Sequence, residues 1–148
     1  MALSPRLRKV NHLKSGPPLP GGKKVYQLPD WKKMSDRNKV KYIKMLMYKF
    51  GRDPRIRNKA VEIYRQYNVQ PRDYRGQSKA LLHWVQTNVY YLNEPSELLM
   101  SPLYVLNPEV MNGDCDDIAI LLGSLAIASR LGVKVVLSGR ARNGKMVR

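Results

Sequence analysis

Cys115 is the residue of this chain with the clearest capacity for chemistry. It lies in the run Gly113-Asp114-Cys115-Asp116-Asp117, directly before a strongly apolar stretch. A cysteine attacks as its thiolate, and the unpaired amides at the start of a helix favour that form. Three neighbouring carboxylates act in the opposite direction, because like charge raises the pKa of a thiol. The sequence therefore indicates a candidate nucleophile and leaves the direction of its pKa shift open.

The partners that a thiol nucleophile needs are missing after the cysteine. Acyl transfer by a thiol requires a base to take its proton and an acid to protonate the leaving group. His12 and His83 both precede Cys115, and no His, Asp or Glu follows Asp117. We expect His83, beside Trp84, to be a partly buried helix histidine. We also expect the three carboxylates to cap a helix rather than to bind a cation, so no metal site and no cofactor are predicted.

Four helices and one strand are expected around this motif. Ser35 is a good N-cap for the first helix, whose polar face is basic, and Gly51 is expected to end it in a left-handed conformation. Asp53-Pro54 opens the second helix and Asn68 ends it. Residues 90–108 are expected to be irregular because three prolines interrupt them. The expected helices cover 35–51, 54–68, 73–88 and 115–131, with Gly132 as the last stop, and the β-branched run 133–137 is the expected strand.

The charge of the chain is large and unevenly distributed. Its 148 residues include 27 Lys and Arg against 11 Asp and Glu, a net charge of +16. Residues 1–52 contain 14 basic and 2 acidic residues, whereas residues 80–129 contain six acidic residues and no Lys or Arg. This polarity indicates that one end of the chain meets an acidic partner, either nucleic acid, an acidic protein surface or an anionic membrane.

Residues 1–33 are expected to form an extended arm, because Pro and Gly in the segment 15–22 disfavour helices and central strands. With few aromatic residues among its basic ones, the arm is a candidate for phosphate contacts without base readout. Its candidate binding residues are Arg6, Arg8, Lys9, Lys14, Lys23, Lys24, Lys32 and Lys33.

Targeting and redox signals are sparse. No apolar run approaches the ~18 residues of a membrane span, and the N-terminus lacks the apolar segment of a secretory signal. One cysteine cannot form an intramolecular disulfide, which fits a reducing compartment or a particle assembled inside a cell.

The features around Cys115 follow a distinctive order. A helix containing Trp84-Val85 is followed by Tyr90-Tyr91, a loop rich in proline, the Gly-Asp-Cys-Asp-Asp motif, an Ala- and Leu-rich helix, a glycine and a Val-rich run. Over roughly residues 54–140 this order resembles the transglutaminase-like superfamily of papain-related thiol domains, above all the versions of tailed bacteriophages. The resemblance implies that Cys115 is the nucleophile and that a His and an Asp follow on later strands. The chain departs from the pattern because that His has no counterpart.

The expected fold class is α+β and predominantly helical. It corresponds to the front, helical part of a transglutaminase-like core with one strand and an extended basic N-terminal arm. The expected divisions are the arm over 1–33, a basic amphipathic helix over 34–52, a partial transglutaminase-like domain over 53–140 and a basic tail over 141–148.

Three functions remain open. The first is a structural or interaction component of a bacteriophage virion, built on a truncated or degenerate transglutaminase-like domain. It would dock through its basic arm on acidic surfaces of other virion proteins or of its own copies. The virion would be assembled in the host cytoplasm. The second is a thiol enzyme (peptidase, amidase or transglutaminase) that uses Cys115 and is present here as a fragment. The third is a nucleic-acid-binding accessory protein. The missing histidine and the segregated charge favour the first.

Overall fold

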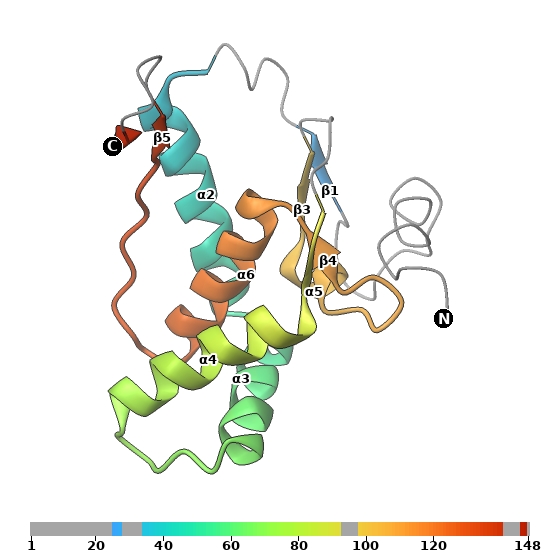
Figure 1. The fold of residues 1–148 in the computed structure, drawn as a ribbon, viewed down its shortest axis with the longest axis vertical. Coiled ribbons are helices and arrows are strands. Elements are labelled where there is room, and N and C mark those ends of the chain that lie inside the picture. The colour runs from blue at the N-terminus through green and yellow to red at the C-terminus, as the bar shows by residue number, and fades with distance from the viewer. Residues whose placement is uncertain (1–24, 28–33, 93–97, 141–145, 148) are drawn as a thin grey trace.

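A computed structural model of the chain describes residues 25–27, 34–92, 98–140 and 146–147. Helices make up most of this part of the chain, and its strands form three short pairs. The expected α+β, predominantly helical class is therefore confirmed. Helix α6 lies at the centre, and α2, α3 and α4 pack around it (Figure 1).

The helices begin at polar caps that the sequence predicts. The Ser35 hydroxyl accepts a hydrogen bond from the Asn38 amide at 3.3 Å, and the Asp53 carboxylate accepts one from the Arg55 amide at 2.9 Å. Each cap satisfies an amide that has no partner within its own helix. The helices are α2 (Asp36–Gly51), α3 (Pro54–Gln66), α4 (Tyr74–Asn88), α5 (Pro102–Val105) and α6 (Cys115–Ala128).

The helix ends differ in part from the expectation. Asn68 is left-handed with φ 53°, so its predicted role after α3 is confirmed. Gly51, by contrast, is the last residue of α2 and is not left-handed, so that prediction is wrong. Helix α6 ends at Ala128, and Arg130, with φ 61°, takes the left-handed conformation expected of Gly132.

The strands form three separate two-stranded sheets. Two of their members lie in the region expected to be irregular, and β1 lies within the expected arm, so backbone pairing joins part of that arm to the domain. The pairs are β1 (Val25–Gln27) with β3 (Leu98–Met100), antiparallel; β2 (Tyr90–Tyr91) with β4 (Asn112–Gly113), parallel; and β5 (Gly139–Arg140) with β6 (Met146–Val147), antiparallel.

The expected strand over residues 133–137 is not formed. The segment between α6 and β5 has no strand assignment and pairs with no other strand of the described residues. In Figure 1 it runs as a long connection beside α2 and α6. Its β-branched composition favours an extended backbone, but a strand also requires a partner in a ladder.

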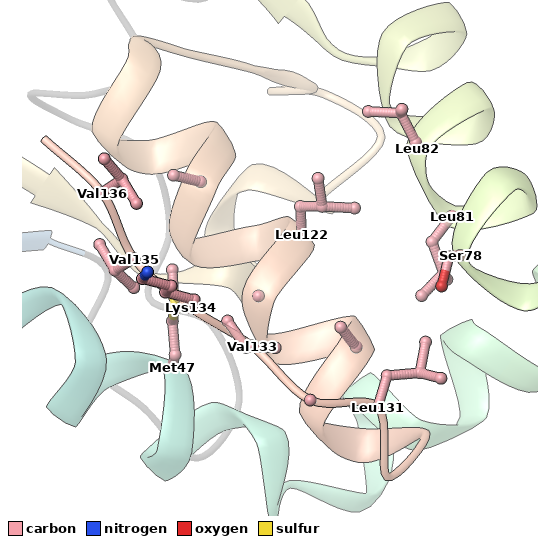
Figure 2. Close-up of a pocket in the computed structure, with 14 residues that line it drawn as sticks. Met47, Ser78, Leu81, Leu82, Leu122, Leu131, Val133, Lys134, Val135 and Val136 are labelled. Carbon is pink, nitrogen blue, oxygen red and sulfur yellow. The ribbon is translucent and has the colours of Figure 1, made fainter. Parts of the chain in front are cut away.

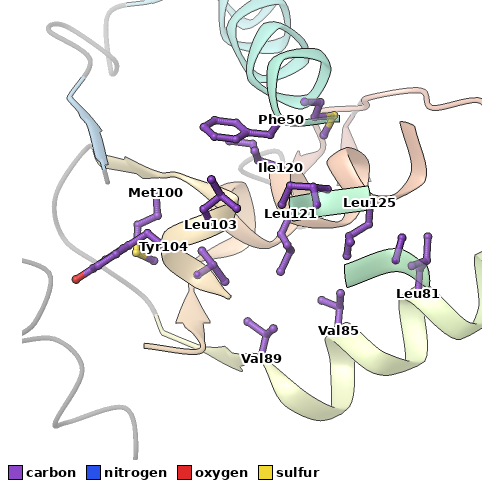
Figure 3. Packing of buried hydrophobic residues seen from close by; sticks show 14 of the residues in the cluster. Phe50, Leu81, Val85, Val89, Met100, Leu103, Tyr104, Ile120, Leu121 and Leu125 are labelled. Carbon is purple, nitrogen blue, oxygen red and sulfur yellow. The ribbon is translucent and has the colours of Figure 1, made fainter. Parts of the chain in front are cut away.

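One hydrophobic core joins the helices (Figure 3). Helix α2 contributes one face to it, so the segment set apart by sequence as 34–52 shares its core with the following helices. The central helix contributes Ile120, Leu121 and Leu125, each with 0% exposure. The core residues of the outer helices include Ile43, Leu46, Phe50, Ile56, Ile63, Leu81, Trp84 and Val85.

Candidate functional site

Cys115 lies at the first position of α6, as the sequence predicts, and is exposed. Its Sγ lies 3.8 Å from Oδ1 of Asp116, in the geometry of a thiol that donates a weak hydrogen bond to a carboxylate. A thiol engaged in this way retains its proton, whereas a nucleophile must lose it. The neighbouring carboxylate therefore acts against thiolate formation.

A capping box fixes the backbone around the cysteine. Oδ1 of Asp114 accepts hydrogen bonds from the amides of Asp116 and Asp117, both at 3.1 Å. In return, Oδ2 of Asp117 accepts one from the Asp114 amide at 3.1 Å. The expected capping role is confirmed for Asp114 and Asp117 but not for Asp116. The two capping carboxylates compensate the helix amides that would otherwise stabilise a thiolate.

Asp117 also links α6 to a strand that precedes it by many residues. Its Oδ1 accepts a hydrogen bond from the Met100 amide of β3 at 2.7 Å. The side chain is completely buried, with 0% exposure. No local pattern in the sequence identifies Met100 as the partner of Asp117. The one available signal is that Asp117 is the third residue of a helix, a position at which a carboxylate often completes a capping box.

Gly113 permits the close packing of the site. A Cβ added to it would lie 2.6 Å from Cβ of Asp117 and 3.2 Å from the Met100 methyl group. Any side chain here would displace the first turn of α6 from β4. The close contact of Gly113 is therefore with Asp117.

The environment of the carboxylates and the thiol is unfavourable for negative charge. Partial burial raises the pKa of Cys115 above its ordinary value, and the charges of Asp116 and Asp114 raise it further. Burial and the charge of Asp114 also raise the pKa of Asp116. Burial, followed by the charge of Asp114, raises the pKa of Asp117 to about 8. The direction left open by the sequence is thus an upward shift for the thiol.

His83 is engaged elsewhere in the molecule. Its Nδ1 lies 2.9 Å from the Tyr67 hydroxyl, and the two rings form an edge-to-face pair with centroids 5.4 Å apart. The side chain is exposed, so the expectation of a partly buried histidine is wrong. The neighbouring Trp84 is buried, and Nζ of Lys59 lies 4.6 Å from its ring centroid. His83 therefore belongs to the contact between α3 and α4 rather than to the surroundings of Cys115.

The predicted binding residues of the arm lie outside the described residues. They are Arg6, Arg8, Lys9, Lys14, Lys23, Lys24, Lys32 and Lys33. The predicted basic face of the next helix lies within the described residues, and Lys41, Lys44 and Lys49 of α2 are exposed.

Two further searches concern the part of the chain that the structure describes. Within residues 25–27, 34–92, 98–140 and 146–147, no group of three or more His, Cys, Asp or Glu side chains is arranged to bind a metal ion. In the same ranges, no helix has both the length and the apolar character needed to cross a membrane.

Comparison of the chain with models of protein families, with curated proteins and with solved structures finds no match.

Proposed function

We propose that this chain is a structural or interaction component of a bacteriophage virion, built on a transglutaminase-like scaffold. The observation that carries the proposal is the environment of Cys115. Burial and the carboxylates of Asp116 and Asp114 raise the pKa of its thiol, and the carboxylates of Asp114 and Asp117 cap the helix that would activate it. A tuned thiol nucleophile needs the opposite shift.

The distribution of charge supports docking on an acidic partner. In addition to the basic arm, exposed basic side chains extend over α2, α3 and α4 of the described residues, while the partly exposed Asp114 and Asp116 lie at the start of α6. Opposite charges on two surfaces direct association and fix its register. The partner is another virion protein or a second copy of the chain, and assembly takes place in the host cytoplasm.

Titration of the Cys115 thiol tests the proposal. The rate of alkylation by iodoacetamide, measured against pH, gives its apparent pKa. We expect a value above the ~8.5 of a free cysteine. Asp116→Asn removes the nearest charge and should lower that value, while Glu109→Gln, an exposed carboxylate outside this turn, should not change it.

Two outcomes would decide against the proposal. An apparent pKa well below ~8.5 would support the thiol enzyme, because it would show that the thiolate forms readily. A second test replaces Cys115 by Ala in the assembling virus. The yield of particles that contain the chain should be unchanged, and a loss of this yield would assign the thiol an essential role.

A further inference from the structure

The segment between α6 and β5 has the side-chain pattern of an edge strand without the pairing of one. Val133, Val135 and Leu137 are partly buried, whereas Lys134 and Val136 between them are exposed. This alternation is the period of an extended chain that packs one face on a core. Within the described residues, however, no backbone hydrogen bond joins residues 133–138 to another segment. Their amides and carbonyls are therefore available to a partner strand.

An apolar pocket of about 550 Å³ adjoins this segment (Figure 2). Side chains of α4 and α6, among them Leu82 and Leu122, and Met47 of α2 form its other walls. Leu82 is 45% exposed and Val136 is 52% exposed, so the pocket presents large apolar groups to solvent. Removal of such groups from water would stabilise an interface with a partner.

The two features together select an extended polypeptide as the occupant. An added strand places alternate side chains on one face, where they can enter the pocket, while its backbone pairs with the open edge. A compact apolar molecule would fill the pocket but would leave the backbone of residues 133–138 unpaired.

Charge selects the kind of polypeptide. Lys134 is exposed between the partly buried residues of this segment, and in the sequence residues 139–148 contain four basic residues and no acidic one. Two copies of a chain with net charge +16 would bring like charges together at this edge. An acidic segment instead complements them.

We propose that residues 133–138 and the adjoining pocket bind an extended segment of a partner protein as an added β-strand. The segment carries apolar side chains at alternate positions and acidic residues at its ends. The proposal goes beyond the proposed function, because it involves neither Cys115 nor the arm and holds whether or not the chain belongs to a virion.

A synthetic peptide tests the proposal on the full chain. The probe is a fluorescein-labelled peptide with three valines alternating with threonines and two glutamates at each end, and fluorescence anisotropy measures its binding. We expect saturable binding that weakens at least tenfold in Leu82→Glu, which places a charge in the pocket. Val61→Glu, an exposed apolar residue of α3 outside this pocket, should bind normally.

Backbone methylation separates strand addition from simple filling of the pocket. Two isomers of the peptide carry N-methyl groups on alternate residues, one isomer on the odd and the other on the even positions. Each isomer therefore lacks the N–H donors along one edge of the peptide strand. A strand pairs through one edge, so one isomer should bind and the other should not. Equal binding of both isomers, or no binding of the parent peptide at millimolar concentration, would overturn the proposal.

The identity of the partner is tested by two comparisons. A peptide with lysines in place of the glutamates should bind at least tenfold more weakly, and equal binding would contradict the acidic partner. In sedimentation of the chain alone, we expect no dimer that depends on this pocket, that is, no dimer that the Leu82→Glu substitution dissociates. Such a dimer would identify a second copy as the occupant.

Discussion

Asp117 connects parts of the molecule that lie far apart in the sequence. Its two carboxyl oxygens accept hydrogen bonds from the Met100 amide at 2.7 Å and from the Asp114 amide at 3.1 Å. The group is fully buried beside another carboxylate, so its protonated form is favoured. At the residue scale, the strongest polar anchor of the motif is therefore Asp117 rather than the cysteine that attracted attention in the sequence.

The first prediction concerns the pH dependence of stability. The pKa of Asp117 rises from 3.8, its ordinary value, to about 8 in the folded chain. The folded state thus binds more protons than the unfolded state between these values, and the free energy of unfolding falls as pH rises through this window. The contribution is complete below about pH 4 and is lost by about pH 8.

Urea unfolding at about pH 5 and about pH 8 measures this contribution. Asp117→Asn cannot titrate, so its stability should depend less steeply on pH than that of the original chain. Asp116→Asn, which leaves the Met100 contact intact, should keep most of the dependence. An equal dependence in the original chain and in Asp117→Asn would show that Asp117 is charged throughout this window.

At the scale of elements, the contact between α2 and α6 depends on small residues. A Cβ added to Gly51 would lie 2.5 Å from Cγ2 and 2.9 Å from Cβ of Ile127. A Cβ on Gly123 would collide with the side chain of Met47. The two helices can approach closely because these positions carry no side chain, and this approach brings the basic α2 into the core.

The second prediction tests this contact. Gly51→Ala should lower the free energy of unfolding by about 1–3 kcal/mol, because Ile127 must move or the helices must separate. Gly132→Ala is the matched control, since nothing lies within 4 Å of its added Cβ. Thermal unfolding of both variants measures the difference, and Ile127→Ala combined with Gly51→Ala should recover part of the loss. Equal stability of the two single variants would contradict the close contact.

At the scale of the whole molecule, most charged side chains of the described residues lie on the surface and outside the hydrophobic core. The described basic side chains of α2 to α4 are mostly exposed, and Asp117 is the one buried carboxylate among the described residues. Charges at such exposed positions contribute little to stability and much to association. We therefore expect the large net charge to affect association with a partner more than the stability of the fold.

The third prediction separates the arm from the folded part. Removal of residues 1–24 deletes six basic residues but leaves β1 at Val25–Gln27. The midpoint of thermal unfolding should hardly change, whereas removal of residues 1–27 should lower it because β3 loses its paired strand. A large loss of stability in the shorter deletion would show that the arm is part of the fold.

The same deletion tests the nature of the acidic partner. Binding to double-stranded DNA of mixed sequence and to polyglutamate is measured at several salt concentrations. For DNA, each phosphate contact contributes about 0.9 to the slope of log affinity against log salt. The nucleic-acid-binding alternative would be favoured over docking on an acidic protein by two results together. The slope for DNA would become less steep by several units in the deletion, and the full chain would bind polyglutamate weakly.

The sequence alone determined the local features of this protein. The caps at Ser35, Asp53 and Asp114, the apolar faces of the helices and the place of Cys115 at a helix start all follow from residues within a few positions of one another. Such features depend on backbone geometry and short-range hydrogen bonds, which are legible in a run of residues.

Only the tertiary structure decided how these features meet. The hydrogen bond from Met100 to Asp117, the pairing of β1 with β3 and the close approach at Gly51 join positions that no local pattern relates. The run 133–137 is the converse case, because its composition predicts a strand that the structure does not form. Its β-branched residues favour an extended chain, but a strand also needs a neighbouring strand to pair with. For Cys115, the sequence contains opposing influences on the thiol, and partial burial with two carboxylates sets the direction of its pKa shift.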